Sequence, residues 1–275
     1  MSAFVRLQHA LPQHRLSRLV GRLAASEHPA LSRLLVRAFA RHYRVNMAEA
    51  ERPDLASYRS FNDFFTRALR PGARPMAPGE RTVVSPADGV VSQAGRIEEG
   101  KLLQAKGLRY PFEALAGGLA SAGFEGGTFA TVYLSPRDYH RVHLPFAGRL
   151  VRTAAIPGKL FSVNAATEAG VQGLFAVNER LVTEWETAAG RMLVVFVGAL
   201  IVASIETVWD GPRSPYRRVQ VDAPASGAFA TGDEIGRFLL GSTVVVAFEK
   251  DRVALDPSVV PGATLRMGQA IGRAR

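Results

Sequence analysis

Ala225-Ser226-Gly227-Ala228-Phe229-Ala230-Thr231-Gly232-Asp233-Glu234-Ile235-Gly236 places a glycine turn between short apolar runs, and residues 261–272 repeat the arrangement. Glycine permits the tight turns that connect strands, and short strands punctuated in this way are typical of sandwiches and barrels. Further β-type runs lie at 82–85, 89–93, 128–134, 141–152, 180–187, 191–197, 199–208, 217–222 and 244–249. We therefore predict a predominantly β (α+β) domain over residues 59–275. Asp233 and Glu234 are expected to lie in a turn, without a catalytic role.

Both glycine turns resemble those of biotinyl or lipoyl carrier domains, which implies a β-sandwich core of duplicated carrier-like hairpins. A carrier domain needs an exposed lysine at its hairpin tip for attachment. No such lysine occurs where the hairpin is expected, and Gly241-Ser242 takes that place. A non-enzymatic carrier-like or membrane-binding module remains one alternative function.

The first 58 residues are predicted to contain basic amphipathic helices. Residues 12–24, and a second segment beginning near Pro29, repeat apolar residues at helical spacing with arginines around the other face. The apolar positions are Leu16, Leu19, Val20 and Leu23, then Leu31, Leu34, Leu35, Ala38 and Phe39. Helices of this kind are typical of proteins that lie in a membrane interface. We expect residues 1–58 to dock on a membrane; surface helices packed on the core are the alternative. Ser60, with Asp63 three residues later, predicts the start of a further short helix.

The positive charge is concentrated near the N-terminus. The chain has a formal net charge of +10, and residues 1–75 hold thirteen arginines against five acidic residues. Such an arm favours an anionic partner, and its aliphatic rather than aromatic apolar residues favour a membrane over nucleic acid. The longest apolar run, residues 192–205, is shorter than the roughly 20 residues that a transmembrane helix needs. Membrane contact is therefore expected to be peripheral. The absence of cysteine excludes disulfides, thiol nucleophiles and zinc–thiolate sites.

Gly241-Ser242-Thr243 has the composition of a peptide bond that its own serine can cut. Glycine leaves the carbonyl carbon of residue 241 unshielded, so the Oγ of Ser242 can attack it and move the acyl group from nitrogen to oxygen. Elimination of the ester then releases Gly241 as a C-terminus, and hydrolysis of the resulting dehydroalanine leaves a pyruvoyl group at residue 242. Taken alone, the tripeptide is more typical of a turn entering a strand.

A nucleophilic serine needs a base, and the base needs a carboxylate to fix its tautomer. Asp88 follows Ser85-Pro86-Ala87 in a turn between two short strands, and His140 and His143 lie three residues apart. Asp88, His143 and Ser242 can supply the set, because their order along the chain does not matter. Each also has a structural interpretation, since an aspartate often caps its own turn and a histidine between apolar neighbours is often a core residue.

At this point the chain resembles the bacterial, pyruvoyl-dependent phosphatidylserine decarboxylases. The resemblance is carried in order by residues 58–67, 71–75, 85–89, 135–145 and 240–243. It implies that Asp88, His143 and Ser242 form a self-cleavage triad that divides the chain into residues 1–241 and 242–275. It also implies that Ser242 becomes the covalent pyruvoyl cofactor and Schiff-base electrophile, without metal or pyridoxal phosphate, and that His140 transfers a proton during decarboxylation.

The same resemblance implies decarboxylation of phosphatidylserine to phosphatidylethanolamine, a homodimer of processed protomers, and a peripheral place on the cytoplasmic face of the bacterial membrane. A pyruvoyl decarboxylase of a soluble amino acid is the other enzymatic alternative, and the amphipathic arm disfavours it. Residues three apart on a strand point to opposite faces, so His140 and His143 are separated if both lie on a strand. If a helical turn continues through His140, both rings can face one pocket, and the sequence leaves this open.

Overall fold

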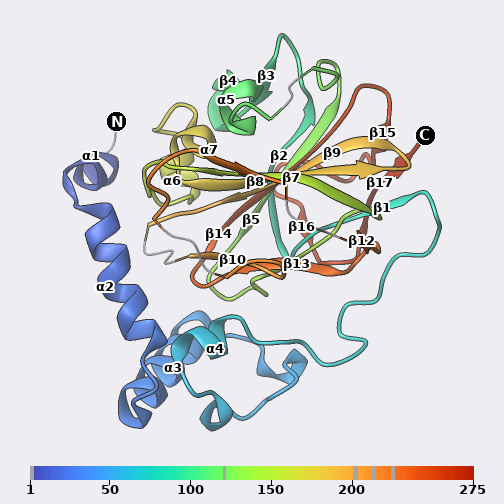
Figure 1. Cartoon of the computed structure of the whole chain (residues 1–275). Helices are drawn as coiled ribbons and strands as arrows, with labels where there is room; N and C mark the ends of the chain where they lie inside the picture. Colours follow the sequence, from blue (N-terminus) through green and yellow to red (C-terminus); the bar gives the residue numbers. More distant parts are fainter. Residues whose placement is uncertain (1–2, 120–121, 201–203, 212–214, 224–226) are drawn as a thin grey trace.

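The computed structural model describes residues 3–119, 122–200, 204–211, 215–223 and 227–275, with residue 242 described by its backbone alone. Residues 1–2 of the predicted docking region, 201–203 of the strand predicted at 199–208 and 225–226 of the glycine turn lie outside the described residues. Figure 1 shows a β-rich body with the N-terminal helices at one side of it. The predominantly β, α+β fold class is confirmed.

The N-terminal helices form where the apolar spacing predicts them. The elements are α1 (Ala3–Ala10), α2 (Gln13–Ala25), α3 (Pro29–Tyr43), η1 (Met47–Glu49), η2 (Leu55–Ser57) and α4 (Phe61–Phe65). Ser60 caps α4, because its Oγ accepts a hydrogen bond of 3.1 Å from the N–H of Asp63. The phenylalanines of α4 form a small core with Val36 of α3 and with Leu240, from the opposite end of the sequence. Among the described residues, no helix is both long and apolar enough to cross a bilayer.

The body is built on one nine-stranded antiparallel sheet. Its order is β11-β7-β8-β9-β14-β5-β2-β16, and β12 also pairs with β7. The strands are β2 (Gly89–Arg96), β5 (Thr128–Leu134), β7 (Gly148–Ile156), β8 (Arg180–Thr187), β9 (Gly190–Val197), β11 (Gln220–Asp222), β12 (Ala228–Phe229), β14 (Ser242–Phe248) and β16 (Thr264–Leu265). β14 lies in the interior of the sheet, hydrogen-bonded to β9 along one edge and to β5 along the other.

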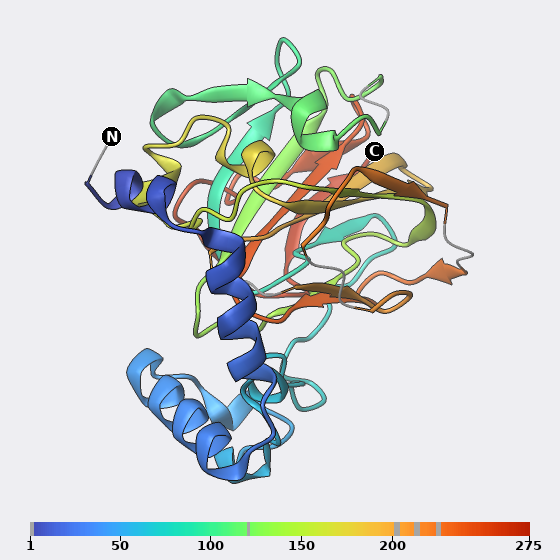
Figure 2. The same ribbon diagram turned by 60° about the vertical axis from the view of Figure 1, so that its left-hand side comes forward.

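The large sheet is covered on both faces, which explains why its central strands are almost wholly apolar. On one face, Val244 and Val246 of β14 belong to a core shared with a small sheet of β10 (Ile205–Thr207), β13 (Glu234–Phe238) and β6 (Arg141–His143). On the other, Val245 and Ala247 pack into a core with residues of α5 (Phe112–Ala116), α7 (Leu174–Val177) and the hairpin of β3 (Lys101–Leu103) and β4 (Arg109–Pro111). Figures 1 and 2 show these two layers on opposite sides of the sheet.

The covering elements are short. They are β3 (Lys101–Leu103), η3 (Ala105–Gly107), β4 (Arg109–Pro111), α5 (Phe112–Ala116), β6 (Arg141–His143), α6 (Ala165–Glu168), α7 (Leu174–Val177), β10 (Ile205–Thr207) and β13 (Glu234–Phe238). A further sheet, β1-β17-β15, contains β1 (Thr82–Val84), β15 (Val253–Leu255) and β17 (Ala270–Ala274).

Several details differ from the sequence prediction. Of the strand predicted at 199–208, only Ile205–Thr207 form a strand, β10, among the described residues. The run 141–152 is two strands in different sheets, β6 and β7, and the break includes Pro145, which has no N–H to offer to a ladder. Glu234 begins β13 instead of lying in the turn, whereas Asp233 does stay in it. The carboxylate of Glu234 accepts hydrogen bonds from Arg141 and Arg237, so its role is to join β6 to β13.

The two glycine turns form, with Gly232 and Gly268 both at positive φ. The strands on either side of each turn nevertheless pair with different neighbours. β12 pairs with β7 while β13 pairs with β6 and β10, and β16 pairs with β2 while β17 pairs with β1 and β15. The turns therefore carry the chain from one sheet to another instead of closing simple hairpins.

Candidate functional site

Three neighbouring strands bring the predicted cleavage bond and Asp88 to one end of the large sheet. Val90 of β2 and Thr243 of β14 are both paired with Tyr133 of β5, one on each side. Since neighbouring strands are about 4.8 Å apart, the backbones of β2 and β14 are ~10 Å apart at this level. Asp88 lies two residues before Val90 and Ser242 one residue before Thr243, so both lie at the same sheet end.

β6 and the residue before it bring the two histidines to this sheet end. The backbone N–H of His143 donates to the carbonyl of Pro86, two residues before Asp88, at 2.8 Å. The carbonyl of His140 accepts from the N–H of Phe238 at 3.0 Å, four residues before Ser242. The backbones of all four predicted site residues are therefore gathered together.

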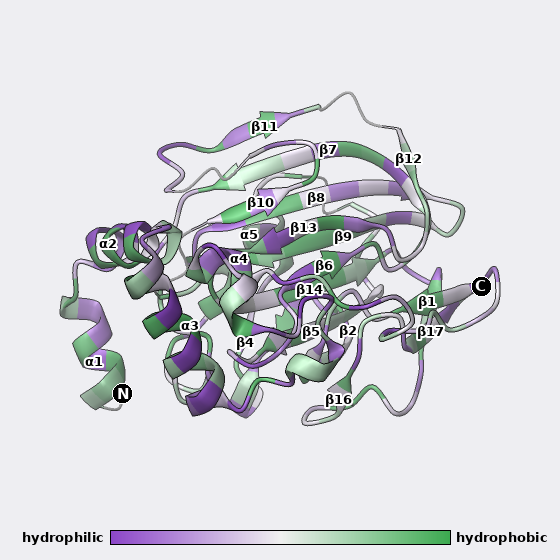
Figure 3. Ribbon diagram, turned by 90° about the horizontal axis from the view of Figure 1, so that it is seen from below, coloured by the Kyte–Doolittle hydropathy of each residue, from purple (hydrophilic) through white to green (hydrophobic). Residues whose placement is uncertain are grey.

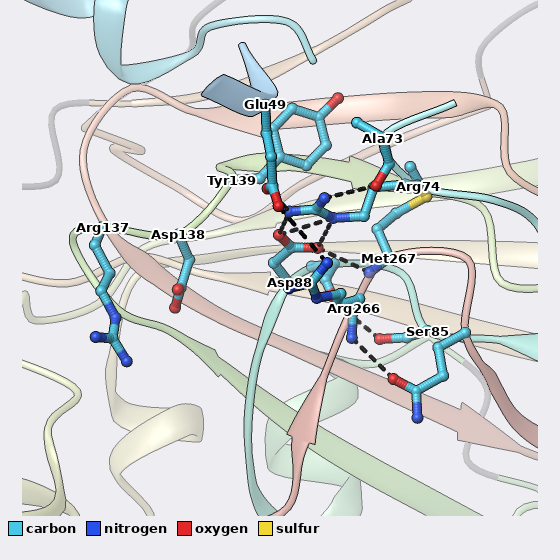
Figure 4. Close-up of polar contacts among 12 residues, drawn as sticks. Glu49, Ala73, Arg74, Ser85, Asp88, Arg137, Asp138, Tyr139, Arg266 and Met267 are labelled. Carbon is cyan, nitrogen blue, oxygen red and sulfur yellow. Dashed lines mark hydrogen bonds and ion pairs between the residues drawn. The ribbon is translucent and has the colours of Figure 1, made fainter. Parts of the chain in front are cut away.

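The carboxylate of Asp88 is held by an arginine that the sequence did not identify. Arg74 donates to it from Nε at 2.8 Å and from Nη2 at 2.5 Å, and the N–H of Met267 donates at 2.9 Å. Nη2 of Arg74 also donates to Glu49 at 2.7 Å, so one guanidinium joins two carboxylates (Figure 4). Its hydrogen bond to Asp88 is the main reason why the pKa of Arg74 lies even above its usual value.

His143 has both ring nitrogens engaged. Its Nδ1–H donates to the carbonyl of Gly232 at 2.8 Å, and its Nε2 accepts from the hydroxyl of Tyr139 at 3.0 Å. Burial lowers the pKa of His143, so the ring is neutral near pH 7 with Nε2 as its acceptor. The hydrogen of the neutral ring is therefore on Nδ1, and the unprotonated Nε2 can act as a base. Asp88 and His143 are neighbours, but their side chains are bonded to other groups rather than to each other.

His140 is fully buried in different surroundings. Its Nδ1–H donates to the carbonyl of Asp138 at 2.9 Å, and its ring lies 4.0 Å from that of Phe65, centre to centre. Its Nε2 has no hydrogen-bond partner among the described residues. Burial, helped by the charge of Arg67, lowers the pKa of His140 to about 3. The ring is therefore neutral at pH 7 and a weak base. His140 precedes β6 instead of lying in it, and its ring packs on Phe65, whereas the ring of His143 packs on Tyr139.

The peptide bond between Gly241 and Ser242 lies where a bend enters β14. The side chain of Ser242 lies outside the described residues, but its backbone is paired with Leu134 of β5. A Cβ placed on Gly241 would meet no atom within 4 Å, and its φ is not in the left-handed region. Neither packing nor backbone conformation requires glycine at 241.

Two hollows adjoin this sheet end. A polar pocket of about 280 Å³ is lined by residues that include Glu49, Arg67, Arg74, Asp88 and Tyr139. An apolar groove of about 570 Å³ lies between α2 and α3, and Leu240 forms part of its lining. Leu240, which precedes Gly241 of the predicted cleavage site, thus lines the groove between the N-terminal helices.

Arg74, Glu49 and Tyr139 are the site residues that sequence reasoning missed. Arg74 lies in a proline- and glycine-rich connector without periodicity, and its partners are 14 and 25 residues away in the chain. Tyr139 is next to His140 in the sequence, and an aromatic hydroxyl beside a histidine pair is the one signal that could have indicated it.

Known proteins resemble this chain along nearly its whole length. The phosphatidylserine decarboxylase family model matches residues 61–273, and a model described as PSD matches residues 3–44. The chain is 50% identical to the phosphatidylserine decarboxylase proenzyme of Azotobacter vinelandii, over 97% of this chain and 96% of that protein. The proenzymes of Methylibium petroleiphilum, 50% identical over 97% and 96%, and Shewanella frigidimarina, 48% identical over 98% and 97%, are similar in the same way. The similarity includes the N-terminal helices as well as the β-rich body.

Proposed function

Since this chain belongs to the phosphatidylserine decarboxylase family, we propose that it is made as a precursor, cuts itself between Gly241 and Ser242, and then converts phosphatidylserine to phosphatidylethanolamine. Residue 242 then carries a pyruvoyl group, whose ketone reacts with the substrate amine and accepts the electrons released as CO2 leaves. The curated relatives are named proenzymes, which supports a processed precursor.

The position of β14 is the observation that carries this proposal. Residue 242 is the first residue of a strand that is hydrogen-bonded on both edges, to β5 and to β9. Cutting before it leaves the pairing of Thr243–Phe248 with both neighbouring strands in place, which keeps residue 242 at the end of the sheet. The segment 242–275 also supplies β16 to the large sheet and β15 and β17 to the small one. Strand pairing between residues 1–241 and residues 242–275 is therefore expected to hold the two chains together after the cut.

The side chains at the sheet end divide the proton transfers between them. His143 takes the proton of Ser242 at Nε2, and the carbonyl of Gly232 holds its Nδ1–H so that this nitrogen is the acceptor. Tyr139 must first withdraw its hydroxyl from Nε2. Asp88 contributes negative charge, which raises the pKa of His143 against the larger effect of burial.

His140 serves the second reaction. Its Nε2 has no partner among the described residues, so it is the nitrogen that can exchange a proton with the substrate. An imidazole whose pKa is held at about 3 by burial is a weak base, so we infer that the negative charge of the substrate raises this pKa before the ring takes the ammonium proton and returns it to the carbon that has lost CO2. The proton-transfer role that the family resemblance implies for His140 remains our proposal, and because the ring starts neutral it accepts a proton before it donates one.

The N-terminal helices support a peripheral place on a membrane. The exposed fractions of Leu19 and Leu34 are 57% and 66%, and Phe4, Leu7 and Leu23 are exposed as well. α2 and α3 turn small or short residues inward instead, such as Ser17 and Ala40. Figure 3 shows hydrophobic and hydrophilic residues alternating along these helices at the edge of the molecule. We infer docking on an anionic surface, at the cytoplasmic face of the bacterial membrane, with the apolar groove next to Leu240 open to acyl chains.

Intact-mass measurement of the purified protein tests the proposal. The expected result is two chains, residues 1–241 and residues 242–275, the smaller with a blocked N-terminus. Ser242→Ala should give one uncut and inactive chain, because no hydroxyl remains to attack. Ser258→Ala, an exposed serine of the same segment, is the matched control and should cut normally. Full-length mass alone in protein that decarboxylates phosphatidylserine would refute the proposal.

The soluble amino-acid alternative is tested with the same preparation. We expect turnover of phosphatidylserine in mixed vesicles to exceed that of free L-serine by orders of magnitude in kcat/KM. Light scattering of the processed protein tests the dimer that the family resemblance implies.

A further inference from the structure

One edge of the large sheet is open. β11 is the first strand in the order of this sheet, and among the described residues it pairs only with β7. Residues 217–221 are all exposed, and the exposed fractions of Val219 and Val221 are 55% and 51%. Figure 3 shows β11 at the outer edge of the molecule, with no labelled strand beyond it. An open edge presents unpaired N–H and C=O groups, so another strand can add to it.

The sequence around β11 is complementary to itself when two copies pair in antiparallel fashion. If Gln220 lies opposite Gln220 of a second copy, Val219 lies opposite Val221 and Arg218 lies opposite Asp222, and each of these pairs occurs twice. Alternate residues of a strand point to opposite faces, so the valines meet on one face and the charged residues on the other. Opposite charges and β-branched residues in such cross-strand pairs both stabilise a sheet.

The contacts that Asp222 already makes are compatible with this pairing. Its carboxylate accepts a hydrogen bond of 2.9 Å from Nε2 of Gln220, two residues earlier on the same face of the strand. A carboxylate offers about four acceptor positions, so a guanidinium from a second copy adds to the existing contacts without displacing them.

Other registers lack the match of charges. Two-fold symmetry requires one residue to lie opposite itself, so the centre of the pairing can move only by whole residues. A pairing centred on Val219 sets Arg218 opposite Gln220, and one centred on Val221 sets Gln220 opposite Asp222. Within residues 217–222, neither of these registers brings a cation opposite an anion. The charges therefore select the pairing centred on Gln220.

The symmetry of this pairing also fits a membrane. The two-fold axis between two antiparallel edge strands is perpendicular to their sheet, so both copies present the same face on the same side. α4 lies on the face that carries β6, because Nε of Arg141 donates to the carbonyl of Thr66 at 2.9 Å and the ring of Phe65 packs on His140. Figure 1 shows α3 and α4 together below β10 and β13. The N-terminal helices of both copies therefore face one membrane together.

We propose that residues 217–222 form the contact between two copies of this chain, with β11 of each copy joining the two large sheets into one continuous sheet. The arginine–aspartate pairs set the register, and the backbone and valine contacts contribute affinity. The inference rests on the dimer that is part of the proposed function, and it is independent of the decarboxylation. A short strand pair is a small interface, so we expect the dimer to dissociate on dilution and to be favoured when both copies dock on one vesicle.

Gln220→Cys tests the register directly, because the chain has no other cysteine. Residues directly opposite each other in an antiparallel pair have Cα atoms about 4.5 or 5.5 Å apart, which a disulfide can span. The purified Gln220→Cys protein should therefore cross-link to its own copy with copper–phenanthroline as the oxidant. Val219→Cys is the matched control. Its copy lies diagonally, at roughly 7–8 Å, and should cross-link far less.

Exchanging the charges tests the pairing without cysteine. Arg218→Asp sets aspartates opposite each other twice, so we expect the dissociation constant of the dimer in sedimentation velocity to rise roughly ten- to hundredfold. Asp222→Arg should have a similar effect, and combining the two substitutions should restore the wild-type value within about threefold. Arg217→Asp makes the same change of charge opposite Ala223 of the second copy. It is the control and should shift the constant by less than about threefold.

Three results would overturn the proposal. Cross-linking of Val219→Cys but not of Gln220→Cys would show a different register. A stable dimer that neither variant cross-links, with an unchanged dissociation constant in Arg218→Asp, would place the interface elsewhere and leave the dimer of the proposed function intact. A chain that is monomeric in solution and is not cross-linked on anionic vesicles would contradict both. Circular dichroism shows whether each variant folds; if Asp222→Arg does not, Arg218→Asp and the two cysteine variants decide.

Discussion

Replacing His140 with glutamine should make the fold less sensitive to acid. In the wild type, burial holds the pKa of this ring at about 3, against 6.5 for an ordinary histidine. The unfolded chain therefore binds a proton below pH 6.5 that the folded chain excludes until pH 3. The free energy of unfolding must fall as the pH falls through this window, and above pH 6.5 His140 has no such effect.

The size of the effect follows from the shift. Each pH unit below 6.5 lowers the free energy of unfolding by about 1.4 kcal/mol, so His140 accounts for a loss of ~2 kcal/mol between pH 7 and pH 5. By pH 3 the loss approaches ~5 kcal/mol, which is comparable to the whole stability of many proteins. The pKa of His143 is also lowered, but its contribution is common to the wild type and the variant and cancels in their difference.

Urea unfolding at pH 7 and pH 5 is the measurement. It is made on the uncut Ser242→Ala precursor, so that one chain unfolds, with and without His140→Gln. We expect the variant to lose ~2 kcal/mol less than its parent between the two pH values. His28→Gln, at an exposed histidine, should show the parent's loss. Equal losses with histidine and glutamine at 140 would refute the burial argument and the assignment of His140 as a neutral proton acceptor.

Three further outcomes are expected. His143→Ala should leave most of the chain uncut on a gel, because no base remains for the serine; normal cutting would contradict this. Asp88→Asn should also cut poorly, since the charge that stabilises a protonated His143 is lost, and full cutting would reassign Asp88 to a structural role. His140→Ala should still cut but lose decarboxylation per cut chain, and an uncut product would reverse the roles of the two histidines. Leu19→Ser should weaken flotation with anionic vesicles roughly five- to thirtyfold, whereas Val260→Ser, equally exposed outside the helices, should not; equal effects would argue against docking.

The strands were predictable where burial leaves a simple pattern. The runs at 128–134 and 180–187 became β5 and β8 with the same bounds, because both lie inside the large sheet. The break in 141–152 was not predicted, since the apolar pattern continues across Pro145 while the chain changes sheets. Which strands pair was beyond the sequence, because the pairing depends on segments more than a hundred residues apart, such as β5 and β14.

The site was predictable in its reactive groups and not in their partners. The residue types alone suggest the chemistry of the serine after glycine, of the carboxylate in a turn and of the two neighbouring histidines. An arginine or a tyrosine in a sequence usually has no role in a site. Only the fold shows that Arg74 bonds Asp88 and that Tyr139 bonds His143. The unpartnered Nε2 of His140 likewise becomes visible only when burial and hydrogen bonds are known.

The contacts of Asp88 define what it can contribute to self-cleavage. The carbonyl of Gly232 already holds the Nδ1–H of His143, so the tautomer is set without a carboxylate in contact. What Asp88 adds is charge, which favours the imidazolium that forms when Ser242 gives up its proton. Arg74 offsets that charge for as long as its guanidinium stays on Asp88, and the same nitrogen also donates to Glu49. Asp88 is one influence among several on the pKa of His143: burial lowers this pKa most, and the hydrogen bond to Gly232 and the charge of Glu234 also raise it. Because Arg74 joins Asp88 to Glu49 of η1, which follows α3, these two ion pairs connect the site to the N-terminal helices.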